Sequence, residues 1–204
     1  MKKIIILILF TYVSLDNLQA QQKKDTIVKK INPILFMDLG FGYANGSLKG
    51  FTGILSVNYQ NKNDVFTLRH IGLAEYDNVD FFLALPFNIE YRRLGEYAVL
   101  YGKRYIDEGT SYHFSGGFSY NSYQQIKSSN ILASEAFVGF PLEAGISWFK
   151  NNKQRFRLLY SLLPIGKRTG FGRSFGVKLY ANLSKRSFVG LGLSFGLGWH
   201  KTYE

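Results

Sequence analysis

SFVGLGLSFGLGW, residues 187–199, decides the fold. From Val189 onward its odd-numbered positions carry large apolar side chains, and its even-numbered positions are glycine and serine up to Gly198. Alternation with a period of two places these two sets on opposite faces of a β-strand. One face of the strand is therefore apolar, and the other carries only small side chains or none. The alternation from Val189 to Trp199 covers 11 residues, within the about 9–11 that a tilted strand needs to cross a bilayer.

Seven further segments repeat the alternation, three of them more weakly. The clear ones lie near residues 174–184, 138–148, 111–120 and 35–43, and the weaker ones near 51–60, 64–73 and 96–105. A soluble β-sandwich or lipocalin-like barrel would carry charges on its outer face. Here the second face is mainly glycine, serine and asparagine, which suits a narrow lumen. We therefore expect an all-β, up-and-down antiparallel transmembrane β-barrel of eight strands.

The spacing between strands predicts which ends of the barrel carry loops. Residues 61–63 and 106–109 read as short periplasmic turns, and 75–95 and 121–132 read as long outer loops. Residues 150–170 would be a long periplasmic connection. In a ten-strand alternative, residues 155–163 and 81–90 would instead supply two more strands. Aromatic side chains on the lipid-facing parity should gather near the periplasmic interface; they are Tyr59, Tyr112, Trp148 and Trp199.

Residues 1–20 have the three parts of a secretory signal peptide. Lys2 and Lys3 precede an apolar run of about ten residues, and a polar segment then ends at Ala20. A transmembrane helix would need about 18 or more apolar residues. We expect cleavage after Ala20, a short periplasmic segment at 21–32 and the barrel at 33–204. Such a chain belongs in the outer membrane of a Gram-negative bacterium.

Composition removes several classes of function. The 204 residues include no cysteine, so disulfides, thiolate metal sites and cysteine nucleophiles are excluded. The three histidines lie far apart without metal-ligand spacing, and we expect neither metal nor cofactor. The formal net charge is +11. For an exported chain, phosphate-bearing lipid headgroups are a more available polyanion than nucleic acid.

Several segments resemble small bacterial outer-membrane β-barrel proteins of the OmpA-transmembrane or OmpX type, and uncharacterised outer-membrane barrels. They are EYAVLYG at 96–102, GFPLE at 139–143 and GVKLYANL at 176–183, with the closing strand. The closing strand also resembles the signal read by the barrel-assembly machinery, through Gly192, Phe195 and Leu197. This resemblance implies the fold and the outer membrane, and it names no activity.

Charged side chains on the glycine-rich parity should point into the lumen. They are Asp38, Arg69, Glu96, Arg104, His113, Glu143 and Lys178. Buried charges persist only when they are paired and hydrogen-bonded, and eight strands leave an interior that side chains just fill. We expect a structural plug of ion pairs. A narrow channel is an alternative that would need a wider lumen.

His113-Phe114-Ser115 supports another alternative. Together with Glu96 and Glu143 it supplies a hydroxyl, a base and an orienting carboxylate, and it resembles the His-x-Ser element of outer-membrane lipid A deacylases. Gly116 stands where those enzymes have asparagine, and the side chains of His113 and Ser115 are expected to point into the lumen. We therefore expect a chain that is not an enzyme, with no catalytic, cofactor-binding or metal-binding residues.

A basic segment completes the candidate surface. It carries no acidic residue between positions 150 and 173 and contains Lys150, Lys153, Arg155, Arg157, Lys167, Arg168 and Arg173. We interpret it as a solvated connection or as a contact for headgroups or cell-wall polyanions. The expected role is structural or interactive, including that of a subunit in an envelope complex. The expected partners are outer-membrane lipids including lipopolysaccharide, the barrel-assembly machinery and an envelope protein.

Overall fold

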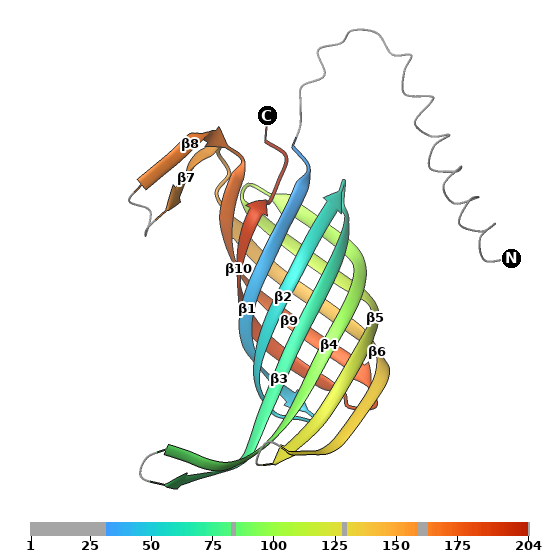
Figure 1. Ribbon diagram of the computed structural model, residues 1–204. Coiled ribbons are helices and arrows are strands. Elements are labelled where there is room, and N and C mark those ends of the chain that lie inside the picture. The colour runs from blue at the N-terminus through green and yellow to red at the C-terminus, as the bar shows by residue number, and fades with distance from the viewer. Residues whose placement is uncertain (1–31, 83–84, 128–129, 159–162, 204) are drawn as a thin grey trace, which may run out of the picture. The chain divides into compact units, whose positions relative to one another are not determined.

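The computed structural model describes residues 32–82, 85–127, 130–158 and 163–203. Eight strands close into an antiparallel barrel in the order β1-β10-β9-β6-β5-β4-β3-β2 (Figure 1). Their bounds are β1 (Ile34–Gly46), β2 (Gly50–Asn61), β3 (Asp64–Phe82), β4 (Leu85–Asp107), β5 (Thr110–Lys127), β6 (Asn130–Phe149), β9 (Phe171–Ser184) and β10 (Phe188–Trp199). The expected signal peptide, and all of segment 21–32 except Asn32, lie outside the described residues. Among those described, no helix is long and apolar enough to span a membrane.

The eight-strand expectation is confirmed, and the ten-strand alternative is wrong for the part of the chain that is described. A strand does form at β7 (Gln154–Leu158), but it pairs with β8 (Leu163–Thr169) in a separate two-stranded sheet. Residues 81–90 do not make a strand of their own, because β3 ends at Phe82 and β4 begins at Leu85. The hairpin β7–β8 therefore belongs to the connection between β6 and β9.

The outer loops expected at 75–95 and 121–132 are instead continuations of strands. β3 and β4 run for 19 and 23 residues, and β5 and β6 for 18 and 20. Pairs of opposite charge join neighbouring strands in these extensions, as between Glu75 and Arg92 at 3.2 Å and between Glu90 and Lys127 at 3.2 Å. Cross-strand ion pairs stabilise a sheet in water, so polar residues there do not indicate a loop.

The ends of the chain meet where β1 pairs with β10. Phe41 lies opposite Leu193 and Gly42 opposite Gly192, in one continuous antiparallel register. A Cβ atom on Gly42 would lie 2.4 Å from the carbonyl oxygen of Leu191 and 2.7 Å from the Tyr180 hydroxyl. Glycine is required there, because the lumen has no room for a larger side chain beside this seam.

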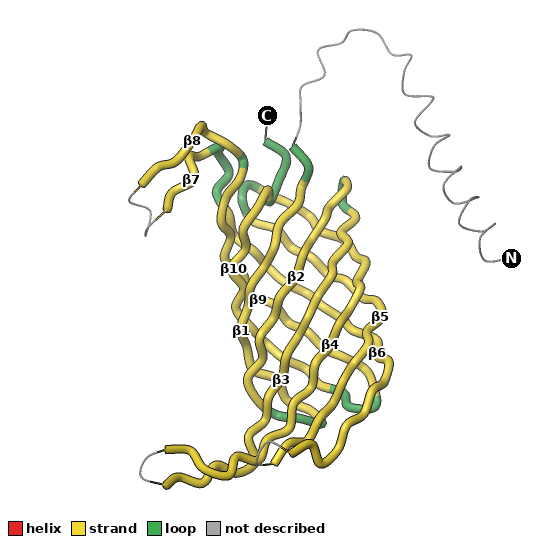
Figure 2. Tube along the Cα trace, in the orientation of Figure 1, coloured by secondary structure: helices red, strands yellow, loops and turns green. Residues whose placement is uncertain are grey.

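The short turns are where the sequence predicts them, at one end of the barrel (Figure 2). Lys62 has a φ of 54°, Glu108 of 37° and Gly109 of 94°, which are left-handed conformations suited to tight hairpins. We call this end, which also holds the start of β1 and the end of β10, the terminal end. The opposite end, with the β3–β4 extension, is the far end.

Candidate functional site

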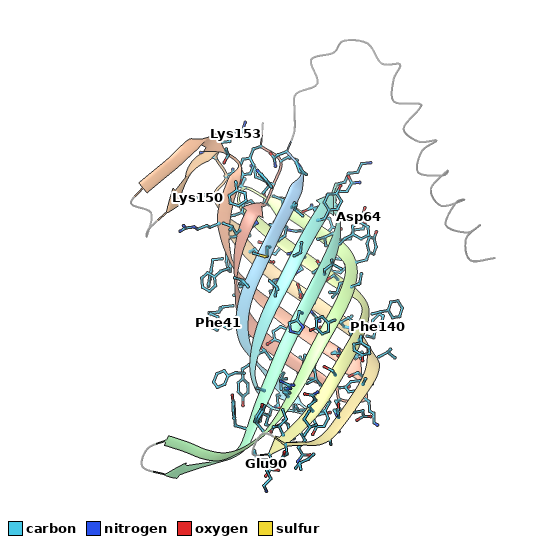
Figure 3. All side chains as sticks on the ribbon, in the orientation of Figure 1. Phe41, Asp64, Glu90, Phe140, Lys150 and Lys153 are labelled. Carbon is cyan, nitrogen blue, oxygen red and sulfur yellow. The ribbon has the colours of Figure 1, made fainter. Side chains whose placement is uncertain are left out.

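The outside of the barrel is apolar over its whole circumference. Its large side chains are between 37% and 80% exposed, and the labelled Phe41 and Phe140 point away from the barrel in Figure 3. Examples from every barrel strand are Leu39, Val57, Leu68, Val99, Phe114, Leu142, Leu179 and Leu191. A surface of this extent would drive association in water, whereas lipid chains solvate it.

Aromatic side chains mark the terminal end of this apolar surface. Tyr59, Tyr112 and Trp148 are 48%, 51% and 45% exposed, which confirms their predicted lipid-facing orientation. Trp199 is half-buried because its ring packs edge-on against Phe171, with 5.2 Å between ring centroids. Aromatic rings collect at headgroup depth, so these residues indicate one membrane interface.

Ion pairs fill the middle of the lumen, as the parity predicts. Arg69 binds two carboxylates, with Nη2 at 2.6 Å from Oε1 of Glu96 and Nη1 at 2.8 Å from Oε2 of Glu143. Lys178 likewise joins Asp38 at 3.0 Å and Glu143 at 3.2 Å. Since Glu143 is shared, these five residues form one connected network.

Neutral amide and hydroxyl side chains complete the network, and the sequence did not predict their part in it. Asn58 donates to Asp38 at 2.9 Å, and Thr67 donates to Asn58 at 2.8 Å. Asn182 donates to Glu96 from the far side of the barrel. The buried carboxylates of Asp38, Glu96 and Glu143 balance the buried cations Arg69, Arg104 and Lys178.

Arg104 closes the lumen at the terminal end. Its guanidinium donates to Gln60 at 2.6 Å, to Ser111 at 3.1 Å and to the carbonyl of His200 at 2.9 Å. It also lies 4.7 Å from the centroid of the Phe36 ring. Neutral acceptors and an aromatic face thus hold this cation, and the bond to His200 ties it to the segment that follows β10.

Residues 200–203 fold back over the same opening. His200 is 1% exposed, and its ring lies 4.9 Å from Phe36 and 5.5 Å from Phe149. Tyr203 donates its N–H to Asn32 at 2.9 Å and its hydroxyl to the carbonyl of Lys150 at 3.0 Å. Burial lowers the pKa of His200 to about 4, so the imidazole is neutral at pH 7. The even-numbered side chains of β10 face the lumen, and His200, the next even-numbered residue, continues this inward orientation.

The far end of the lumen is apolar, which corrects the expectation of small and polar groups throughout. Its buried side chains are Ala44, Leu48, Ile54, Ile71, Leu73, Leu94, Tyr123, Tyr180 and Phe188. At this level β3 and β4 carry Ile71, Leu73 and Leu94 inward and Gly72, Gly95 and Arg93 outward, so the apolar residues change to the inward face there. The hydroxyl of Tyr180 contacts Thr52, and apolar packing closes this end.

Comparison with known proteins gives matches in structure alone. No protein-family model and no curated protein matches the chain. The N-terminal β-barrel domain of Pseudomonas aeruginosa OprF has a TM-score of 0.49 and 12% identity, covering 81% of this chain and 98% of that one. Neisserial surface protein A (NspA) has a TM-score of 0.48 and 11% identity over 80% and 95%. The outer membrane enzyme PagL has a TM-score of 0.42 and 12% identity over 80% and 99%.

The chain is an integral outer-membrane β-barrel. Eight closed antiparallel strands, an outward apolar belt with aromatic residues at its edge and a polar interior are the features of that class. Identities of 10–12% give no activity to this chain.

His113 and Ser115 face the lumen, and no hydrogen bond joins them in the described part of the chain. His113 Nε2 lies 3.0 Å from Oε1 of Glu143. Ser115 is 7% exposed, and its hydroxyl has no hydrogen-bond partner in the described part of the chain. The histidine therefore joins the ion-pair network through Glu143. Nor do the described residues include a group of three histidine or acidic side chains that could hold a metal ion.

The basic segment lies at the terminal end, where Figure 3 labels Lys150 and Lys153. Both side chains are exposed, as is Arg173 at the start of β9. The side chains of Arg155, Arg157, Lys167 and Arg168 lie outside the described residues. The placement agrees with a connection on the same side as the two turns.

Proposed function

We propose that the protein is a sealed structural barrel with an interaction role in the cell envelope, as a subunit of an envelope complex. The observation that carries this proposal is the filled lumen. The side chains of Arg69, Glu96 and Glu143 are 0%, 0% and 2% exposed, so water does not reach them. The terminal end is capped by the segment 200–203 and the far end by apolar packing.

A filled lumen disfavours the channel alternative. Passage of a solute would require Arg69 and Lys178 to release three carboxylates together. Breaking one buried ion pair costs about 3–5 kcal/mol, and the network holds several such pairs. A protein with this interior acts through its outer surfaces.

The far end offers a surface for a protein partner. β2 pairs with β3 only as far as Phe51↔Ala74, whereas β3 and β4 stay paired as far as Phe82↔Leu85. β9 likewise pairs with β6 only from Ser184↔Gly139. Residues 75–82 and 130–138 are thus the two outer edges of a sheet that extends beyond the barrel. Unpaired strand edges can hydrogen-bond a strand of another protein.

Photo-cross-linking in whole cells tests the partner. A photoreactive amino acid is placed at Leu132, on the β6 edge, and in a matched variant at Leu191, in the lipid-facing belt. The two side chains are 58% and 59% exposed. We expect a discrete cross-linked protein from Leu132 and none from Leu191. The same products from both sites, or none from either, would contradict an interaction role.

Two measurements on purified protein test the alternatives. In planar bilayers we expect no steady conductance, and open-channel steps would restore the channel hypothesis. Ser115→Ala and His113→Ala should leave the acylation of outer-membrane lipid unchanged. Loss of an acyl-trimming activity in either variant would favour a lipid-modifying enzyme instead.

A further inference from the structure

A cavity of about 420 Å³ opens on the outside of the barrel, across β3, β4 and β5. His70, Gly72, Arg93, Gly95, Tyr97 and Ser122 contribute to its lining. Tyr97 is 60% exposed and shares its parity with the lipid-facing Val99 and Tyr101. The cavity therefore faces the membrane, where polar side chains need a polar ligand.

Three small residues, Gly72, Gly95 and Ser122, form the floor of this cavity, which is an open groove. Gly72 lies opposite Gly95, and Gly95 lies opposite Ser122. A Cβ atom at Gly72 would meet nothing within 4 Å, so the space above it is open. A Cβ atom at Gly95 would lie 3.1 Å from the Ser122 hydroxyl and 3.9 Å from Cε1 of His70. The hydroxyl and the imidazole thus flank one gap above Gly95.

His70 is held in a defined orientation. Its Nδ1 lies 2.9 Å from the carbonyl oxygen of Glu96, and its ring stacks on Tyr97 with 4.4 Å between centroids. A carbonyl can only accept, so Nδ1 carries the proton and donates it. Nε2 is then available to a ligand atom in the groove.

Arg93 supplies a cation at the far-end side of the groove. Its Nε donates to the Gln124 amide oxygen at 2.7 Å, a neutral acceptor, and among the described residues no carboxylate forms an ion pair with it. Arg93 lies opposite Ala74, which lies opposite Phe51. The rings of Phe51 and Tyr43 meet edge to face at 5.6 Å in this row. Aromatic rows of this kind sit at headgroup depth.

We propose that this groove binds the phosphate-bearing headgroup of an anionic membrane lipid. Arg93 binds the phosphate, the Ser122 hydroxyl donates to a headgroup oxygen above Gly95, and Nε2 of His70 accepts a hydrogen bond from a headgroup hydroxyl. A guanidinium matches the oxygens of a phosphate group with paired N–H donors. The apolar belt below the groove takes the acyl chains. This site is separate from the strand edges proposed for a protein partner, and neither proposal depends on the other.

The test is a lipid titration of the purified full chain, followed by native mass spectrometry, with phosphatidylglycerol as the probe. Gly72→Leu fills the groove, and Gly53→Leu is its matched control. Gly53 lies opposite Gly72, also has open space above it, and does not line the cavity. Arg93→Gln removes the cation, and Arg92→Gln removes a neighbouring charge paired with Glu75.

We expect Arg93→Gln to weaken phosphatidylglycerol binding about fivefold, the effect of roughly 1 kcal/mol per basic group at an anionic surface. Gly72→Leu should also weaken binding, because its side chain fills the groove. Both controls should bind as the native chain does. Phosphatidylcholine should bind more weakly, and inorganic phosphate should not displace the bound lipid. Equal weakening in variants and controls, equal binding of phosphatidylcholine, or displacement by inorganic phosphate would each overturn the assignment. Heat-modifiable gel mobility establishes folding of every variant, and Arg93→Gln suffices if Gly72→Leu fails to fold.

Discussion

Replacement of Arg69 by methionine should destabilise the barrel more than any other single substitution in its interior. The guanidinium makes three short contacts, with Nε and Nη2 on Glu96 at 3.0 Å and 2.6 Å and Nη1 on Glu143 at 2.8 Å. Without it Glu143 keeps Lys178 and His113. Glu96, which is 0% exposed, then keeps only the amide of Asn182 among the described side chains. Leaving a buried charge uncompensated costs about 3–5 kcal/mol.

The compensating double variant makes the prediction sharper. Arg69→Met combined with Glu96→Gln removes the arginine and the charge that it neutralises, so the loss should be smaller than the sum of the two single losses. Coupling energies between residues in contact are about 0.5–3 kcal/mol, and we expect the upper half of that range. Lys185→Met, at an exposed pair with Glu135, is the control and should leave stability unchanged.

The measurement is urea titration of the protein in lipid vesicles, followed by the fluorescence of Trp148 and Trp199. A loss of less than about 1 kcal/mol for Arg69→Met, which is the size of a surface pair, would refute the view that the network is dry. Strict additivity in the double variant would refute the direct coupling of Arg69 to Glu96.

Three further outcomes are expected. Leu193→Arg should impair membrane assembly, because a cation facing lipid near the midplane costs about 2–4 kcal/mol. Val189→Arg, near the far-end turn of the same strand, should be better tolerated. Equal assembly of both variants in heat-modifiability gels would refute the orientation. A cysteine at Asn152 should resist a membrane-impermeant thiol reagent on intact cells and react after permeabilisation, while one at Ser187 should react on intact cells; the reverse result would place the terminal end outside. His200 has a pKa lowered to about 4 by burial, below its ordinary 6.5, so the unfolded chain takes up the proton first and stability should fall as the pH drops from about 6.5 to about 4. His200→Phe should flatten that part of the pH profile of the urea midpoint, and an unchanged slope would show that the buried ring does not contribute.

The sequence was sufficient for the parts of the fold that depend on one strand at a time. Alternation of side chains predicts the inward direction of Asp38, Arg69 and Lys178 and the outward direction of Tyr59 and Trp148, and the structure confirms both. The number of barrel strands follows from counting such segments.

Contacts between residues on different strands could not be predicted from the sequence, because they depend on the register between strands. That Arg69 reaches both Glu96 and Glu143 follows from the stagger of strands around the barrel, which no local pattern encodes. The groove beside His70 has the same origin, because Gly72 and Gly95 are neighbours only through pairing. The extensions beyond Glu75 were mistaken for loops, since strands in water carry polar residues on both faces.

The balance of charge in the lumen restricts how this chain can evolve. Three carboxylates and three cations share a dry interior, so loss of one of them leaves an excess of the opposite charge inside the barrel. A lineage that replaces Glu143 by a neutral residue should also replace Lys178 or Arg69, or gain a new acid within reach of them. Divergent relatives should therefore differ at these positions in linked pairs, while the lipid-facing leucines and valines exchange one at a time.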